Sequence, residues 1–257
     1  MSAALEVSGV SKSFGGVRAL SLCDLQVEEG TIAGLIGPNG SGKTTLFNVV
    51  TGYERIRQGE VHFRGRRITN SPPDTVFKLG LGRTFQLTRI FARLTVMENM
   101  LVATQHREGW LRSMLHSPHA PGERRRALEL LEFVGLAAAR DKPAGVLSYG
   151  QQRLLEFAYI LVADPQVILL DEPASGVNLT LIEQLADRIR DCNAEGRTFL
   201  VVEHNMEFVM GLCDKVTVMH QGRTIMSGAP EEVRAHPDVL DAYLGGDFPR
   251  ADELAGA

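Results

Sequence analysis

The sequence predicts an α/β protein in which apolar strands alternate with helices, and two observations support this fold class. Residues 4–10 and 20–27 alternate apolar and polar side chains, as half-buried strands do. Short apolar runs at 31–36, 167–171 and 198–202 are each followed by a segment of helical character. Strands that alternate with helices in this way are typical of parallel β units.

The first half of the chain follows this alternation and then departs from it. A glycine-rich loop follows the run at 31–36, and TTLFNVVTG (44–52) then has helical character. The stretch 61–63 is another short strand, which Gly65 closes. From about 88 to 163 strand signals disappear and apolar residues recur at helical spacing, so we expect an inserted helical lobe there.

The second half returns to alternating strands and helices. A helix over about 179–193 is expected after the strand at 167–171, and the strand at 198–202 follows it. A short helix comes next, and KVTVMHQGRTIMSG (215–228) is expected to form a hairpin. Pro230 is then placed to begin a last short helix.

The composition is that of an ordinary globular protein. The chain has 257 residues with a net charge of −4, so its bulk electrostatics do not favour a nucleic-acid partner. Its length fits one core with an insertion, and we expect a single domain over 1–250 with a flexible tail over 251–257. The cysteines form no C-x-x-C pair, which favours free thiols in a reducing compartment.

Targeting and membrane signals are not expected from the sequence. The N-terminal MSAALEVSGVSKSFGG has no basic region followed by an apolar one, unlike a signal peptide. No stretch approaches eighteen uninterrupted apolar residues, so we expect no membrane-spanning helix. A position at a membrane would therefore depend on another polypeptide.

A phosphate-binding loop is indicated by GPNGSGKTT (37–45), which fits G-x-x-x-x-G-K-[ST] after an apolar strand and before a helix. Its glycines let backbone N–H groups converge on phosphate oxygens, and the helix N-terminus favours negative charge. Lys43 would bind the β- and γ-phosphates, and the Thr44 hydroxyl suits Mg²⁺. The alternative is a glycine-rich turn with a solvated lysine. The candidate nucleotide-binding residues are Gly37, Pro38, Asn39, Gly40, Ser41, Gly42, Lys43, Thr44 and Thr45.

Two other apolar strands end in polar groups. VILLDEP (167–173) ends with Asp171, which could hold Mg²⁺ through its water shell, and Glu172, which could deprotonate an attacking water. The alternative is a polar strand end that caps the next turn. His204 follows TFLVV at the strand edge where open α/β sheets bind ligands, so it could contact a γ-phosphate rather than serve as an ordinary surface histidine.

Two further residues are weaker candidates. Gln86 follows GLGRTF at the expected junction with the helical lobe, where its amide could bind Mg²⁺ weakly or hold a water. Phe14 lies in a glycine-rich turn and could stack on a purine, although an aromatic at the edge of the core would give the same pattern.

Taken together, and in the order in which they occur along the chain, these motifs resemble those of the ATPase subunit of an ABC transporter. The resemblance implies ATP and Mg²⁺ as cofactors and a head-to-tail dimer with each nucleotide between two subunits. It makes Glu172, His204, Lys43 and Gln86 the catalytic candidates, and Thr44, Gln86 and Asp171 the metal ligands. The matching motifs are GPNGSGKTT for Walker A, Gln86 for the Q-loop, LSYGQ (147–151) for the signature, VILLDEP for Walker B, ASGVN (174–178) for the D-loop, His204 for the switch histidine and Phe14 for the adenine-stacking aromatic.

The signature LSYGQQR (147–153) contains no obvious nucleophile, base or metal ligand. Ser148 and Gln151 have the spacing of a capping box, which would start the helix that follows. A helix N-terminus beside Gly150 is also an anion site. The resemblance implies that Ser148, Gly150 and Gln151 bind the ATP of the partner subunit. Tyr149 stands where many relatives have glycine, and its contacts are left open by the sequence.

Several motifs narrow the resemblance to importers of branched-chain and other hydrophobic amino acids. These are GRTFQ, LSYGQQR, VEHNMEFVM and the ending HPDVLDAYLGG, and residues 104–126 resemble an insertion of that branch. The expected partners are a second ATPase subunit (a homologous chain or a second copy of this one), two permease subunits and, indirectly, a solute-binding protein. The expected location is the cytoplasmic face of the plasma membrane, as a peripheral subunit.

Other functions remain compatible with parts of the pattern. ATPases of importers for urea, amides or aromatic acids, and an ATPase that extracts lipopolysaccharide, share much of it. A soluble ABC-type ATPase of DNA repair or translation and a simple P-loop kinase are more distant alternatives. One departure from many relatives is Asn178 in place of aspartate, which removes a charge from the D-loop but leaves an amide that can cap the next helix.

Overall fold

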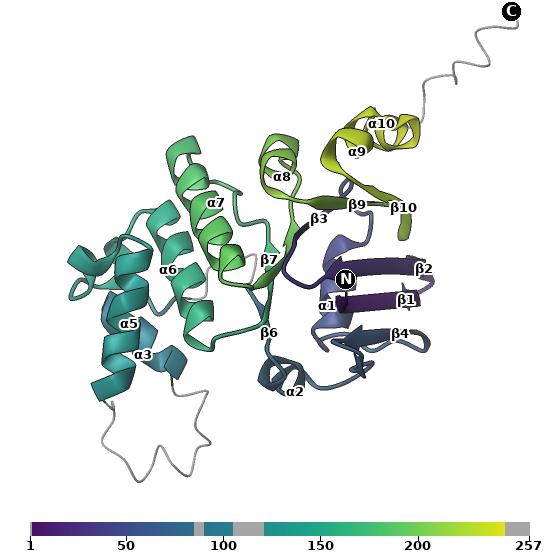
Figure 1. Ribbon diagram of the computed structural model, residues 1–257. Helices are drawn as coiled ribbons and strands as arrows, with labels where there is room; N and C mark the ends of the chain where they lie inside the picture. The colour runs from purple at the N-terminus through teal and green to yellow at the C-terminus, as the bar shows by residue number, and fades with distance from the viewer. Residues whose placement is uncertain (1, 85–89, 105–120, 245–257) are drawn as a thin grey trace, which may run out of the picture. The chain divides into compact units, whose positions relative to one another are not determined.

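The computed structural model describes residues 2–84, 90–104 and 121–244. The chain divides into two compact units, which are coloured along the sequence in Figure 1. The terminal unit comprises Met1–Val76 and Leu200–Ala257, and the central unit comprises Phe77–Phe199. Helix α2 (Pro73–Lys78) and strand β8 (Thr198–Val202) contain the two boundaries.

The terminal unit begins with an antiparallel sheet whose strand order is β2-β1-β4-β5. Phe14 pairs with Val17 at the end of the first hairpin, and Gly15 and Gly16 between them have positive φ angles of 49° and 88°. A two-residue hairpin loop needs this backbone to match the twist of its strands, and glycine adopts it without steric cost. The strands are β1 (Ala3–Phe14), β2 (Val17–Glu28), β4 (Gln58–Phe63) and β5 (Arg66–Arg67).

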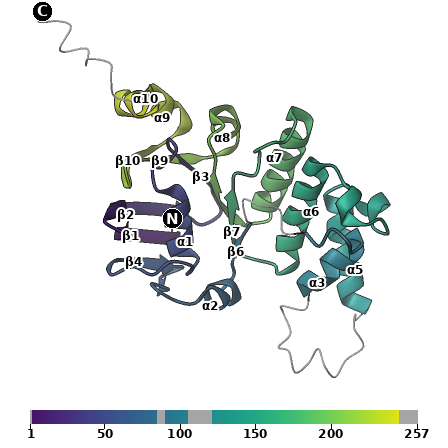
Figure 2. The ribbon, with the colours of Figure 1, turned by 180° about the vertical axis from the view of Figure 1, so that it is seen from behind.

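The other strands of the terminal unit are arranged in the order β10-β9-β3-β8. Strand β3 (Ile32–Ile36) is parallel to β9 (Lys215–His220), and β9 forms an antiparallel hairpin with β10 (Arg223–Gly228). Helices α9 and α10 pack against this hairpin (Figures 1 and 2). The helices of this unit are α1 (Lys43–Val50), α8 (Met206–Leu212), α9 (Pro230–Ala235) and α10 (Pro237–Leu244).

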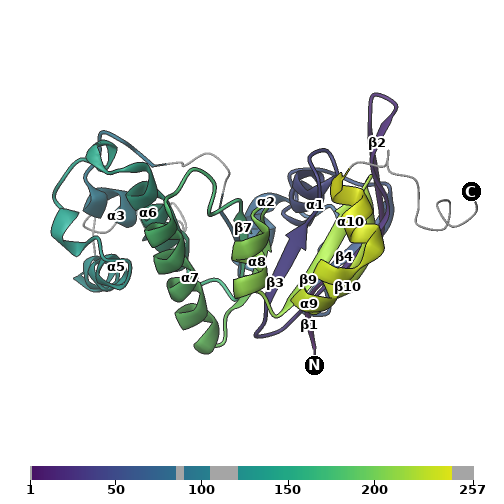
Figure 3. The ribbon, with the colours of Figure 1, turned by 90° about the horizontal axis from the view of Figure 1, so that it is seen from above.

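The central unit combines short parallel strands with a group of helices. Strand β6 (Leu81–Arg83) is parallel to β7 (Val167–Asp171), and Thr198 at the start of β8 donates a backbone hydrogen bond to Gln166. Helices α3, α5 and α6 contact one another, and α6 lies beside α7 (Figure 3). These helices are α3 (Val96–Thr104), α5 (Pro121–Phe133), α6 (Tyr149–Val162) and α7 (Leu179–Ala194), with 3₁₀ turns at Ala137–Ala139 and Ala144–Val146.

Both units have apolar cores, and all three cysteines are buried in them as free thiols. Burial raises the pKa of the Cys23 and Cys192 thiols to about 11, and that of Cys213 to about 12. Because the thiolate is the reactive form, these side chains behave as small apolar groups at neutral pH. The expectation of free thiols is confirmed.

Every strand and helix expected from the sequence is present; β1, β2 and β4 are a few residues longer than their patterns, and β7 and β8 have the expected bounds. Among the strands and α-helices, β5, α2, β6 and α10 were not expected. Strand β6 has three residues, too few for a periodic pattern, while α2 and α10 each begin at a proline in a segment that resembles a turn. The expected lobe boundaries of 88–163 stay a prediction.

Among the described residues, no helix has the length and apolar character needed to cross a bilayer. The expected tail at 251–257 and most of the branch insertion at 104–126 lie outside the residues that the structure describes.

Candidate nucleotide-binding site

The phosphate loop of the terminal unit fits into a space that only glycine backbone can occupy. A methyl group at Gly37 would lie 2.1 Å from the Met219 carbonyl oxygen, and one at Gly42 would lie 2.6 Å from the Ala19 carbonyl oxygen. Gly222, in the turn between β9 and β10, donates its N–H to the Ser41 carbonyl oxygen at 2.9 Å. Strand β2 and the β9–β10 turn therefore fix the shape of the loop from two sides.

Lys43 is almost completely buried inside the loop that precedes it. Its ammonium donates hydrogen bonds to the carbonyl oxygens of Gly37 at 2.7 Å and Pro38 at 3.0 Å, and to the Ser41 hydroxyl at 3.3 Å. Three oxygen acceptors compensate the desolvation of this cation. They also fix its position, so an arriving phosphate would meet a charge that is already oriented.

Helix α1 presents an uncapped N-terminus at the end of this loop. Its N-cap is Gly42, which has no side chain to accept from the first-turn N–H groups, and no acidic residue occupies the first turn. The orphan N–H groups and the helix dipole favour an anion here. Thr44 is exposed and Thr45 is half-buried, while Asn39 and Gly40 are exposed at the tip of the loop.

Phe14 ends strand β1 and is 45% exposed, so it is not part of the core. The Lys12 ammonium lies 4.8 Å from its ring centroid, and Lys12 itself is held by Glu54 at 2.7 Å. The ring is therefore partly accessible, and its role as an adenine-stacking surface stays a prediction.

His204 follows β8 and is 58% exposed, whereas its neighbour Glu203 is completely buried. The Glu203 carboxylate accepts hydrogen bonds from the backbone N–H groups of His204 at 3.1 Å and Asn205 at 3.4 Å. Sequence reasoning missed Glu203, because an acid after an apolar strand gives no signal for the backbone groups it will bind. Its carboxylate fixes the chain at the residue that carries the imidazole.

In the central unit, Asp171 is 3% exposed at the end of β7 and is paired with Arg83. An Arg83 guanidinium nitrogen lies 2.9 Å from Asp171 Oδ2, and the Asp171 N–H donates to the Thr84 hydroxyl at 3.2 Å. Both partners come from β6 and the residue after it, so the unexpected strand β6 supports the predicted carboxylate. Arg83 lies 88 positions before Asp171, and no local pattern predicts the pair.

Glu172 is half-buried and has a positive φ of 48°. A non-glycine residue in this region is strained by roughly 1–3 kcal/mol, and such residues gather at functional sites because the surrounding structure holds them there. Its carbonyl oxygen accepts from the Ser175 N–H at 3.2 Å, which starts the turn into the D-loop segment.

The signature segment begins helix α6 with the capping box that its sequence predicts. The Ser148 Oγ accepts from the Gln151 N–H at 3.3 Å, and the Gln151 side chain accepts from the Ser148 N–H at 3.0 Å. The hydroxyl proton of Ser148 is not used by the box and can be donated to another acceptor. Asn178 likewise caps α7, accepting from the Leu181 N–H at 3.0 Å, as expected.

The structure therefore places the predicted residues in two groups. The terminal unit holds Phe14, the loop 37–45 and His204, and the central unit holds Ser148, Gly150, Gln151, Asp171 and Glu172. Gln86 lies outside the described residues. Within the described ranges, no three His, Cys, Asp or Glu side chains gather to form a ready-made metal site.

The oxygen donors present nevertheless fit Mg²⁺. Each unit contains a donor of the kind that Mg²⁺ prefers: the terminal unit has the Thr44 hydroxyl, and the central unit has the Asp171 carboxylate, one oxygen of which binds Arg83. Mg²⁺ usually keeps several waters and binds one or two protein oxygens together with substrate phosphates, so a sparse donor set is what this ion needs.

Tyr243, in α10, is a further residue that the sequence did not indicate. Burial raises the pKa of its hydroxyl, an effect that the Gly37 backbone N–H partly offsets by donating to it. The C-terminal helix thus contacts the first glycine of the phosphate loop.

Comparison with known proteins decides the family. The model of the family described as "ABC transporter" matches residues 20–175, which include the phosphate loop, the signature and the Asp171-Glu172 pair. The chain belongs to the ABC transporter family. This ATP-binding cassette has the P-loop α/β fold that its sequence predicts, and it binds nucleotide. A second family, described as "Branched-chain amino acid ATP-binding cassette transporter", matches residues 223–249.

The cassette is similar over nearly its whole length to characterised relatives. It is 40% identical over 249 residues to the branched-chain amino acid transport ATP-binding protein BraF of Pseudomonas aeruginosa, with 94% of this chain and 97% of the relative covered. It is 39% identical, with the same coverage, to LivG of Salmonella typhimurium, which carries the same description. A solved ATP-binding cassette in its ADP conformation has a TM-score of 0.86 and 34% identity, covering 95% of this chain and 100% of that one.

Proposed function

We propose that this cassette is the ATP-hydrolysing subunit of an importer for branched-chain or related hydrophobic amino acids. The observation that supports it most strongly is the pair of family matches, one over the ATPase motifs and one at 223–249. The names of BraF and LivG support the same solute class. Two permease subunits and a solute-binding protein would complete the importer, with the cassette at the cytoplasmic face of the plasma membrane.

Each residue has a proposed role in hydrolysis. A water attacks the γ-phosphorus of ATP, Glu172 takes its proton, and the bond to the β–γ bridging oxygen breaks to release ADP and phosphate. Lys43, His204 and the first-turn N–H groups of α1 bind the charge on the phosphates. Mg²⁺, held by Thr44, Asp171 and Gln86, would neutralise that charge further. Phe14 would stack on the adenine.

The signature would serve the nucleotide of a second subunit. Ser148, Gly150 and Gln151 stand at the N-terminus of α6, which favours an anion, while Lys43 already provides a phosphate site in each chain. A helix N-terminus that donates to the partner's γ-phosphate explains why this segment has no catalytic side chain of its own.

Substitution of Glu172 tests the hydrolysis mechanism. Glu172→Gln keeps the size of the side chain but cannot accept a proton, so we expect hydrolysis to fall by at least about 100-fold. ATP binding, measured by titration, should be unchanged, and an ATP-dependent dimer should accumulate on gel filtration. Glu183→Gln, an exposed position on α7, is the matched control and should keep full activity. Undiminished turnover in Glu172→Gln would refute the assignment of the base.

The solute class needs the complete importer. With permeases and solute-binding protein from the same gene cluster reconstituted in vesicles, leucine or valine should stimulate the ATPase and accumulate inside. Phenylalanine, urea and an amide are the comparison solutes. Stimulation by urea or an amide alone would reject amino-acid import while leaving the ATPase assignment intact.

A further inference from the structure

Tyr149 lies between two residues of the signature, yet its side chain contacts a different segment of the central unit. A methyl group placed on Gly176 of the D-loop would lie 3.1 Å from Tyr149 Cε1 and 3.7 Å from Cδ1. The edge of the ring therefore rests on the bare backbone of Gly176. This glycine has a positive φ of 71°, so both its conformation and its missing side chain are required where the ring sits.

The other side of Tyr149 is fixed by Arg153, one helical turn later. A guanidinium nitrogen donates to the Tyr149 hydroxyl at 2.7 Å, and the guanidinium carbon lies 5.2 Å from the ring centroid. Arg153 is 6% exposed and is held by Glu156, whose Oε2 lies 3.1 Å from it. A buried arginine with two partners has little freedom, so the tyrosine ring is held between this side chain and the D-loop.

The neighbouring Gly150 brings the same two segments together a second time. A methyl group there would lie 2.2 Å from Leu181 Cδ1 and 3.4 Å from Val177 Cγ1, so a larger residue would have to displace the Leu181 side chain. The first turn of the signature helix is thus fixed against residues 176–181 at two adjacent positions. Interiors packed at this density transmit a displacement of one segment to the other.

We propose that Tyr149 is a positioning residue that fixes the D-loop at Gly176 to the signature helix, so that both segments reach a partner subunit in one fixed arrangement. The inference rests on the proposed two-subunit ATPase, in which Ser148 and Gly150 bind the partner's nucleotide. Tyr149 itself is 45% exposed, and its contacts are with Gly176 and Arg153 of its own unit. It acts through Gly176 and Arg153.

Amide hydrogen exchange in the isolated cassette tests the link without nucleotide. Loss of the ring in Tyr149→Ala should speed exchange of the backbone amides at 174–178 by about tenfold, the scale expected when contacting residues are uncoupled. Tyr149→Phe keeps the ring and should change this exchange little. Tyr159→Ala, a half-buried tyrosine on the same helix, is the matched control and should leave 174–178 unchanged. Equal exchange in all variants would overturn the proposal.

The consequence for the dimer is measured in the Glu172→Gln background. Adding Tyr149→Ala should leave ATP affinity of the monomer unchanged, because the phosphate loop is intact, but reduce the ATP-dependent dimer by about tenfold in association constant. Adding Tyr159→Ala should reduce neither. If Glu172→Gln binds ATP but forms no dimer, either with itself or with the homologous ATPase of the same gene cluster, the proposed two-subunit function is wrong. If it dimerises and Tyr149→Ala does not weaken the dimer, only this inference fails.

A double-mutant cycle separates the contact from general destabilisation. Gly176→Ala places a methyl group against the ring, so in the parent it adds a steric clash to the cost of its positive φ. In a Tyr149→Gly background only the φ cost remains. The second substitution should therefore weaken the dimer several-fold less when Tyr149 is absent, and strict additivity would contradict the proposed contact.

Discussion

The phosphate loop of the terminal unit is shaped by contacts with backbone carbonyl oxygens. The candidate residues of the central unit are instead held in position by buried side chains. Gly37 and Gly42 lie against carbonyl oxygens of neighbouring strands, and the lysine of the loop binds the loop's own carbonyls. Asp171 and Tyr149, by contrast, are each held by a buried arginine. A site built from backbone resists most substitutions except at its glycines, and a site built from buried charges depends on each partner.

The largest loss of stability is expected where a buried carboxylate of the central unit would lose its arginine partner. Arg83→Ala leaves the Asp171 carboxylate buried without its cation, which typically costs about 3–5 kcal/mol. Urea unfolding of this variant should show that loss of stability. Arg83→Ala combined with Asp171→Asn should recover part of it, because the buried charge is then removed. A loss below about 1 kcal/mol in Arg83→Ala would show that the pair does not support β7.

A second prediction concerns the backbone-built loop. Gly37→Ala would place a methyl group 2.1 Å from the Met219 oxygen, so strands must move apart and we expect a loss of about 3 kcal/mol. Gly40→Ala is the control, since Gly40 also has a positive φ (79°, against 149° at Gly37) but nothing within 4 Å of the new methyl group. It should cost about 1–2 kcal/mol. Equal losses in urea unfolding would mean that conformation alone, and not close packing, requires Gly37.

The cap of α7 gives a smaller effect that separates hydrogen bonding from charge. Asn178→Ala removes the acceptor for the Leu181 N–H and should cost about 1 kcal/mol. Asn178→Asp keeps the acceptor and adds a charge that the helix dipole favours. It should match or slightly exceed the parent in stability. If Asn178→Asp instead loses as much as Asn178→Ala, the side chain does not cap this helix.

Local sequence was enough to predict the parts of the site that are built from neighbouring residues. The loop at 37–45, the Ser148 capping box and the Asn178 cap each depend on groups within a few positions, and each is present as expected. Arg83 and Asp171 are far apart in sequence, and β6 is too short for a pattern, so their pairing could not be read from the chain. Tyr149 marked a departure from relatives, but only the fold shows what its ring touches.

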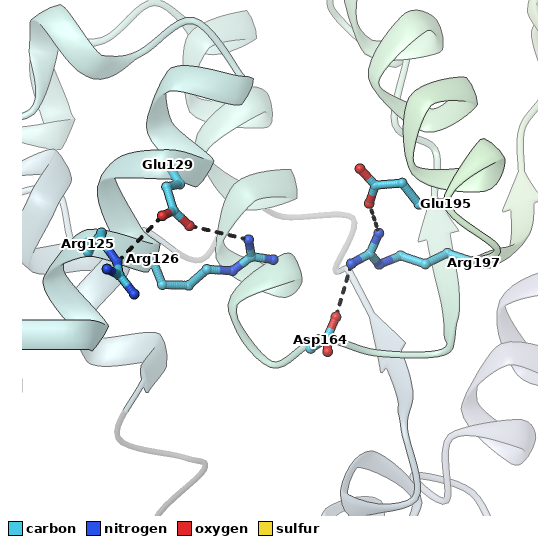
Figure 4. Close-up of polar contacts among 6 residues, drawn as sticks. All are labelled: Arg125, Arg126, Glu129, Asp164, Glu195 and Arg197. Carbon is cyan, nitrogen blue, oxygen red and sulfur yellow. Dashed lines mark hydrogen bonds and ion pairs between the residues drawn. The ribbon is translucent and has the colours of Figure 1, made fainter.

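The smallest effect is expected at charged pairs that lie outside any buried network. Figure 4 shows Arg125 and Arg126 beside Glu129 on α5, and Arg197 between Asp164 and Glu195. The Arg125 side chain is 81% exposed and 3.7 Å from Glu129, so Arg125→Ala should change stability by less than about 0.5 kcal/mol. Arg197 is 15% exposed and joins the chain after α6 to the end of α7.

Removal of Arg197 should therefore cost more, about 1 kcal/mol, although all three arginines form ion pairs. Thermal unfolding at low and high salt distinguishes the two cases, because screening weakens exposed pairs first. Equal and negligible losses of stability in Arg125→Ala and Arg197→Ala would mean that an arginine with 15% exposure stabilises this unit no more than an exposed one. Arg83 and Arg153 are 8% and 6% exposed, the lowest values among the arginines in the ion pairs described. An arginine of this unit would then stabilise the fold only when it is buried to that degree.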